Sequence, residues 1–83
     1  MLKIKKIILD VLKPTELRTS LIIEVLKKAK VSRIEINTYE LERNTEYLKI
    51  VIEGDSLDVD NISSLIREYG GVVQNLDGLV AEK

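Results

Sequence analysis

Hydrophobic and polar residues alternate along four segments of the chain and recur at helical spacing along two others. The alternating segments are rich in Ile, Leu and Val, as half-buried strands are, and cover residues 2–12, 31–42, 47–54 and 72–81. The helical segments are residues 15–29 and 58–69. Between Ile4 and Ile7 the apolar side chains change parity, which predicts a bulge near residues 5–6. The predicted order is therefore βαββαβ.

Several residues predict where these elements begin and end. Pro14 is expected to end the first strand because it cannot donate a ladder hydrogen bond. Thr15 is a candidate N-cap for the first helix, and Asp58 for the second. Leu57 and Ile62 have the spacing of a hydrophobic staple around Asp58. Glycines 70 and 71 end the second helix, residues 43–46 form a polar turn, and Gly78 predicts a bend in the last strand.

Two crossovers that contain helices, joined by a central hairpin, predict a ferredoxin-like α+β sandwich with a four-stranded antiparallel sheet and both helices on one face. The length of 83 residues fits one domain, residues 1–83. Parity assigns one apolar set to the helix side of the sheet: Ile7, Leu9, Val11, Ile34, Ile36, Leu48, Ile50 and Ile52. A second set should point away from the helices: Ile8, Leu12, Tyr39, Leu41, Tyr47 and Val51. We expect this uncovered face, or an edge strand near Ile23, to join copies of the chain in a homo-oligomer.

The residue types that the chain lacks exclude several kinds of catalytic and metal site. The chain has no Cys and no His, which excludes disulfides, thiolate nucleophiles and imidazole bases, and the usual zinc ligands. It shows no glycine-rich phosphate loop, so we expect no enzymatic activity. No apolar run approaches the ~20 residues that span a bilayer, and no signal peptide is evident, so we expect a cytoplasmic protein without a membrane partner.

Charge is divided unevenly along the chain. Residues 1–33 carry nine basic and three acidic groups, whereas residues 34–60 carry two basic and eight acidic groups. Opposed charges of this kind can attract within a monomer or between subunits, and a pI near 5.4 argues against a dedicated nucleic-acid binder. We expect a solvated or inter-subunit position for the lysines at 3, 5, 6, 13, 27, 28 and 30.

Four short strings occur together in the order and spacing of a known family. They are the run at residues 9–14 (LDVLKP), the hairpin acids Glu40 and Glu42 with residues 45–46 (TE), the run at 52–54 (IEG), and residues 70–72 (GGV) with 76–77 (LD). Together they resemble a small archaeal family of uncharacterised proteins with a ferredoxin-like fold. The resemblance implies that fold and homo-oligomeric assembly, and it supplies no activity. Glu42 stands where members tend to carry Asp, and Gln74 where many carry His, which weakens any case for a transition-metal site.

The acidic positions that match this family are the candidate metal ligands: Asp10, Glu40, Glu42, Glu46 and Asp77. A carboxylate within an apolar strand needs a cation, a hydrogen-bond donor or a proton, and the hairpin glutamates could supply oxygen ligands to a hard cation such as calcium. Alternatively, the hairpin acids form a solvated turn and Asp10 pairs with Lys49. Residues 55–61 fail the spacing of a calcium loop and are explained by helix capping.

The sequence thus leaves three functions open. The leading one is a non-catalytic homo-oligomeric binding or regulatory module that takes a divalent cation or small ligand near its subunit junctions. The second is a purely structural or protein-interaction oligomer without a ligand. The third is an RNA-associated factor that uses the basic first third of the chain, although few aromatic residues are present for base stacking.

Overall fold

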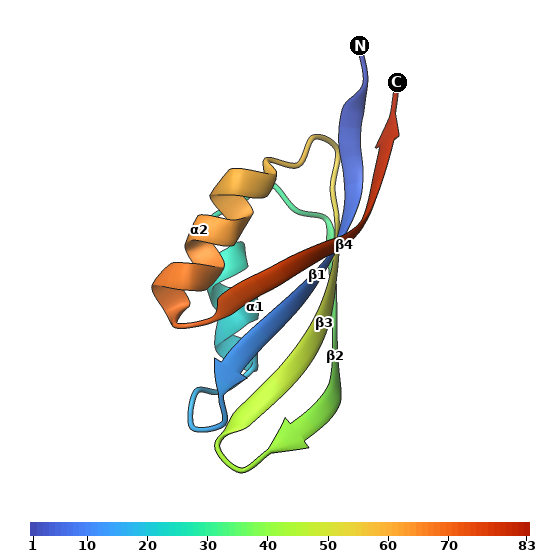
Figure 1. The fold of residues 1–83 in the computed structure, drawn as a ribbon. Helices are drawn as coiled ribbons and strands as arrows, with labels where there is room; N and C mark the ends of the chain where they lie inside the picture. Colours follow the sequence, from blue (N-terminus) through green and yellow to red (C-terminus); the bar gives the residue numbers. More distant parts are fainter.

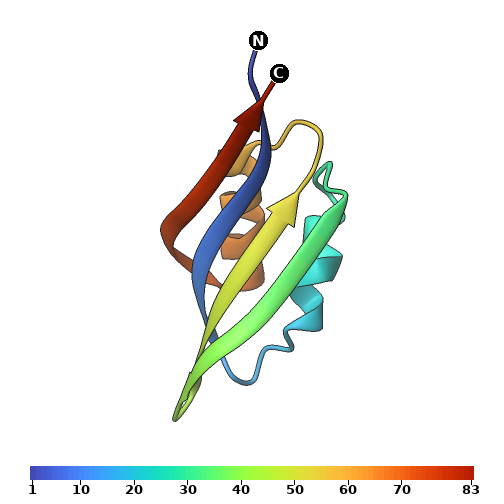
Figure 2. The same cartoon turned by 90° about the vertical axis from the view of Figure 1, so that its right-hand side faces the viewer.

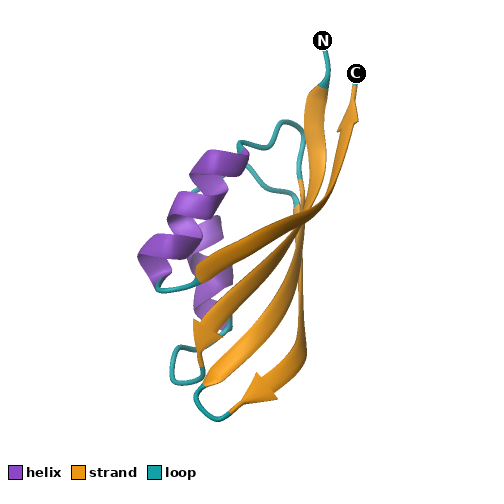
Figure 3. Cartoon of the chain, viewed as in Figure 1, coloured by secondary structure: helices purple, strands orange, loops and turns teal.

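The computed structural model describes residues 1–83 and consists of one sheet with two helices on one of its faces (Figures 1 and 3). In chain order the elements are β1 (Lys3–Pro14), α1 (Ser20–Leu26), β2 (Arg33–Glu42), β3 (Thr45–Glu53), α2 (Val59–Tyr69) and β4 (Val72–Glu82). The strands lie in the order β2-β3-β1-β4, and every neighbouring pair is antiparallel. The predicted ferredoxin-like α+β sandwich is confirmed.

The core lies between the sheet and the helices. The two central strands, β1 and β3, place every second side chain against α1 and α2, as the alternation predicts. Each fully buried aliphatic side chain contributes about 1.5–3 kcal/mol. The core contains twelve buried residues: Ile7, Leu9, Val11, Ile22, Leu26, Leu48, Ile50, Ile52, Leu57, Ile62, Leu65 and Ile66. On the edge strand β2, Ile34 and Ile36 are only partly buried.

Helix α2 has the boundaries that its sequence predicts. The Asp58 carboxylate accepts a hydrogen bond from the Asn61 amide, 3.0 Å away, and so satisfies one of the free donors at the helix start. Leu57 and Ile62 both enter the core, in agreement with the predicted staple. Gly70 ends the helix with φ of +116°, a left-handed conformation that glycine adopts without steric cost.

Helix α1 is shorter than predicted, and Thr15 is not its cap. The helix covers Ser20–Leu26, and the segment between Pro14 and Thr19 forms turns instead. Those turns are held by the Lys13 ammonium, which donates to the carbonyls of Pro14 and Leu17. A helix capped at Thr15 would use the Leu17 carbonyl, but not that of Pro14, in its own first turn. The predicted buried stripe is confirmed at Ile22 and Leu26.

Pro14 ends β1, as predicted, although the strand runs two residues past the expected limit at Leu12. It is the last residue of the strand and pairs with Thr45 of β3, whereas β4 reaches only as far as Leu12 on the other side of β1. At Pro14 the strand therefore has one neighbour, and the missing N–H breaks no ladder hydrogen bond. Directly after it, the Thr15 amide donates to the Asn44 carbonyl and so keeps this end of β1 attached to the β2–β3 turn.

Lys13 is buried, which corrects its placement among the solvated lysines. Only 2% of the residue is exposed, and it faces the helix side of the sheet. Its Nζ donates to the two carbonyls and also forms an ion pair with Glu46, whose Oε2 lies 3.2 Å away. The pair fastens the end of β1 to the start of β3.

Bulges change which side chains share a face. The register between β1 and β4 shifts at Lys5, as predicted, and again beside Asp77 and Gln74. The register between β2 and β3 shifts at Tyr39, so Leu41 pairs with Glu46 and lies on the helix side. The expectation that Leu41 points away from the helices is therefore wrong. Leu41 is nevertheless 70% exposed, because this end of β2 extends beyond the helices (Figure 1).

Figure 2 looks onto the sheet face opposite the helices, which we call the open face; both helices lie behind the sheet in this view. No other element of the chain covers it. No helix is both long and apolar enough to cross a membrane.

Candidate functional site

The open face carries two apolar groups separated by a polar row. Ile8 and Val51 are partners on β1 and β3, as are Leu12 and Tyr47, and all four are half-buried. Between these pairs one row of partners crosses the whole sheet: Asn37, Lys49, Asp10 and Asn75. The face is therefore more polar than the sequence predicts, and a second charged group, Arg33 with Glu35 and Glu53, lies on it beyond Ile8 and Val51.

Three charged side chains meet in that row. Asp10 lies opposite Lys49 on β3, and the Lys49 Nζ is 3.9 Å from Asp10 Oδ1. The same Nζ is 3.3 Å from Asp77 Oδ2. The predicted alternative partner of Asp10 is thus present, and it serves Asp77 as well. We call Asp10, Lys49 and Asp77 the carboxylate cluster.

A bulge brings the third member into the carboxylate cluster. Ile8 pairs with Gly78 and Leu9 pairs with Leu76, so Asp77 is an extra residue on β4. Gly78 leaves room for this distortion, because a side chain there would lie 3.1 Å from Ile8 Cδ1. The predicted bend at Gly78 was the sequence signal, although periodicity alone could not show that it would turn Asp77 toward Asp10.

Asp10 is the least exposed member of the carboxylate cluster. Its side chain is 17% exposed, and Oδ1 is buried without a hydrogen-bond donor. Burial is the main cause that raises the Asp10 pKa, followed by the adjacent Asp77 carboxylate, which would accept from a protonated Asp10 and repels an ionised one, while Lys49 opposes the shift. The same contacts, with Asp77 first, raise the pKa of Lys49. A proton on Asp10 would let it donate to Asp77.

Two tyrosines border the carboxylate cluster. The rings of Tyr39 and Tyr47 have centroids 6.1 Å apart, and the Lys49 Nζ lies 5.7 Å from the centroid of Tyr39. This places a cation over an aromatic face and beside two carboxylates. Burial is the main cause that raises the pKa of both phenols; nearby carboxylates, Asp10 for Tyr39 and Glu42 for Tyr47, add to the shift. Two carboxylates surround one ammonium in the cluster, and this excess of acidic groups favours cations over anions.

The remaining predicted ligands lie elsewhere. Glu40 pairs with Tyr47 and Glu42 with Thr45, toward the hairpin end of the open face, and both are exposed. Glu46 faces the helix side, where it binds Lys13. Of the five candidates the structure brings together only Asp10 and Asp77, and no group of three or more acidic residues is arranged to hold a metal ion.

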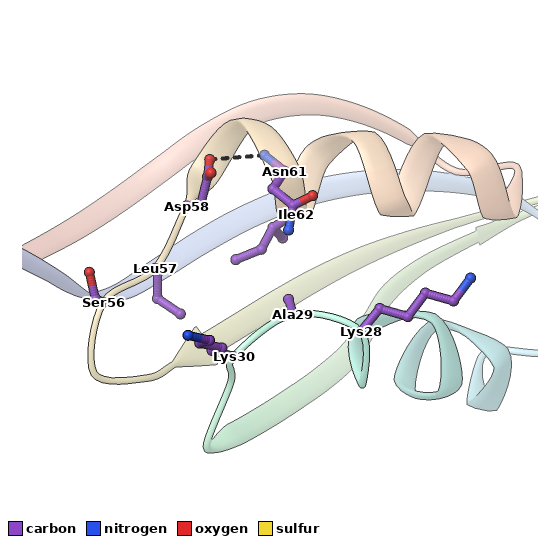
Figure 4. Close-up of a pocket in the computed structure, with 8 residues that line it drawn as sticks. All are labelled: Lys28, Ala29, Lys30, Ser56, Leu57, Asp58, Asn61 and Ile62. Carbon is purple, nitrogen blue, oxygen red and sulfur yellow. Dashed lines mark hydrogen bonds between the residues drawn. The ribbon is translucent and has the colours of Figure 1, made fainter.

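A separate hollow of about 240 Å³ lies between the end of α1 and the start of α2 (Figure 4). Lys28 and Lys30 line it from one side, and the N-terminus of α2 from the other. The Asp58 carboxylate already occupies the helix start, and the Lys28 side chain points away from the other lining residues. The hollow thus offers no developed anion site.

Comparison with known proteins assigns the chain to a family. Residues 5–83 match the model of DUF211, a family described as uncharacterised ArCR. An uncharacterised protein of Methanocaldococcus jannaschii is 36% identical over 81 residues, which is 96% of this chain and 84% of that protein. The predicted resemblance to a small archaeal family of uncharacterised proteins is confirmed, and the chain belongs to the DUF211 family.

Proposed function

We propose that this protein is a non-catalytic binding module that assembles with copies of itself and holds a cationic ligand at the carboxylate cluster. The observation that carries the proposal is the composition of the open face. Half-buried apolar pairs flank two adjacent carboxylates on a surface that no element of the chain covers. Such a surface is stabilised when another molecule excludes water from it.

Nothing in the carboxylate cluster favours catalysis. Its lysine is engaged by both carboxylates, and none of the three cluster residues lines a hollow in which a substrate could be held. The carboxylates of the cluster would repel a phosphate backbone. These features support a binding module over an enzyme or an RNA-associated factor.

Assembly is tested by replacing a half-buried apolar residue of the open face. Light scattering of the wild type at micromolar concentration is expected to give a multiple of the 9.4 kDa chain mass. Val51→Lys should reduce that mass while far-UV circular dichroism stays unchanged. Leu2→Lys is the control, because Leu2 is exposed and precedes β1. A wild type that is monomeric would overturn the assembly proposal.

A divalent cation is the ligand that the buried, donor-free Asp10 Oδ1 favours. Calcium accepts irregular oxygen sets more readily than magnesium does, so calcium should raise the melting temperature more. Asp10→Asn and Asp77→Asn should each abolish that increase, whereas Glu42→Gln should preserve it because Glu42 lies outside the cluster. If neither ion shifts the wild-type melting temperature, the module is a structural oligomer without a cation.

A further inference from the structure

Strand β4 is an edge strand with an unusual amount of exposed surface. It pairs only with β1, so its outer backbone groups have no partner within the chain (Figure 2). Nine of its eleven residues are exposed. Four of these are large and apolar: Val72, Leu76, Leu79 and Val80. An exposed edge of this kind readily pairs with another strand.

The opposite edge of the sheet is protected, and β4 is not. β2 carries four charged side chains, namely Arg33, Glu35, Glu40 and Glu42. Charges along an edge discourage pairing with another chain. β4 has only Asp77 and Glu82 and contains no Lys, Arg or Pro. Pairing with a strand of another chain is therefore easier at β4 than at β2.

The side chains of β4 are arranged symmetrically about Leu76. Its register partners Leu9, Val11 and Ile7 place Leu76, Val73 and Leu79 on the helix side. Two residues separate Leu76 from Val73, and two separate it from Leu79. A regular strand would have one residue in each interval; here each also contains an extra residue, Gln74 in the first and Asp77 in the second. Val72 and Val80 then lie on the open face at equal distances from Leu76. The order of faces reads the same in both directions.

We infer that β4 pairs antiparallel with β4 of a second copy, about a two-fold axis at Leu76. The occupant is a second copy because only the same strand, reversed, repeats both bulges in register; a regular strand would lose pairs at each bulge. The resulting partners match in face and polarity: Leu76 with Leu76, Val73 with Leu79, Val72 with Val80, and Asn75 with Asp77. No like charges are opposed.

A stable contact would use a substantial share of the surface of this small chain. Standard interfaces take about 800 Å² from each partner, roughly 15% of the 5317 Å² that this chain exposes. The nine exposed residues of β4 provide apolar surface on both sides of the sheet, and main-chain hydrogen bonds along the strand would add to it. The product is a continuous eight-stranded sheet with a two-fold axis.

This pairing also completes the carboxylate cluster, and in that respect the inference rests on the proposed function. Asn75 of the second copy lies opposite Asp77 and brings an amide donor to it. The two copies of Asp77 become diagonal neighbours, which in an antiparallel pair are about 7–8 Å apart. The cation site thus acquires oxygen ligands from both copies, beyond the two that one chain supplies.

Single-cysteine variants test the register, since the chain has no native cysteine. Leu76→Cys is expected to give a disulfide-linked dimer under mild oxidation, because opposite residues have Cα atoms about 4.5–5.5 Å apart, within disulfide range. Leu79→Cys is the matched control, on the same strand and face and with 46% exposure against 47%. Two copies of residue 79 would be about 20 Å apart. We expect about tenfold more dimer for Leu76→Cys than for Leu79→Cys.

If the Leu76→Cys variant does not fold, a second pair of cysteine variants tests the same register. Val72→Cys mixed with Val80→Cys should cross-link, while either alone should not. A multimeric wild type in which neither the Leu76→Cys variant nor this mixture cross-links would overturn the β4 pairing and leave the assembly proposal intact. A monomeric wild type would overturn both.

Discussion

Lys13→Met should be among the most destabilising single substitutions in this protein. Methionine keeps the length and apolar stem of the side chain and removes only the ammonium group. In the structure that group binds Glu46 and the carbonyls of Pro14 and Leu17 from a position that is 2% exposed. The substitution therefore leaves a carboxylate and two carbonyls without their donor.

The cost can be estimated from those contacts. Breaking a buried ion pair by removing one partner costs about 3–5 kcal/mol. The Glu46 side chain is 15% exposed and retains some water, so the loss should lie near about 3 kcal/mol. An 83-residue domain has a total stability of about 4–12 kcal/mol, so this is a large fraction of it. The midpoint of unfolding should fall accordingly.

Urea unfolding followed by circular dichroism measures this loss directly. Lys28→Met is the control, since Lys28 is exposed and makes no ion pair; it should change stability by less than about 0.5 kcal/mol. Glu46→Gln combined with Lys13→Met should cost less than the sum of the single changes, because the two groups interact. A loss below about 1 kcal/mol for Lys13→Met would refute the reasoning that this ammonium is buried and paired with Glu46.

Three further predictions concern other residues. Asp58→Ala should cost about 1 kcal/mol by leaving the start of α2 uncapped, whereas the neighbouring exposed Asp60→Ala should cost less; equal losses in thermal melts would contradict the cap. Gly70→Ala should cost about 1 kcal/mol or more in the same assay, because φ is +116° and the new Cβ would lie 2.7 Å from Leu17 Cδ1; an unchanged melting temperature would count against this. Asp10→Asn should raise the metal-free melting temperature at neutral pH. Because folding raises the Asp10 pKa, its ionised form penalises the fold above the folded pKa, and the penalty is relieved as the pH falls toward the unfolded pKa. The advantage of Asn should therefore disappear in acid, and a pH-independent difference would show that charge is not its cause.

The sequence identified two residues of the carboxylate cluster and placed a third acidic residue there wrongly. Asp10 and Asp77 were named from the sequence, and the structure places them together with Lys49. Glu46 was named with them because it is an acidic position that matches the resembled family, yet it faces the opposite side of the sheet and binds Lys13. Strand parity could have separated Glu46 from Asp10, because it shares the face of Leu48 and Ile50. Charge alone could not.

The sequence by itself determined the type and order of the elements. Alternation along β1 and β3 and helical spacing along α2 each admit one way of burying their apolar side chains. The boundaries of α2 follow equally from local chemistry, because Asp58 and Gly70 act on the backbone within a few residues of themselves. These signals do not depend on any other part of the chain.

Only the tertiary structure decided the features that depend on neighbouring strands. Pro14 could remain in β1 because β4 ends before reaching it. Helix α1 begins at Ser20 and not after Thr15, and the segment before it is held in turns by the buried Lys13, which donates to the carbonyls of Pro14 and Leu17. Asp77 met Asp10 because a bulge set two residues of β4 against one of β1. Each outcome depends on pairing register and on competition for hydrogen-bond partners, which join residues far apart in the sequence.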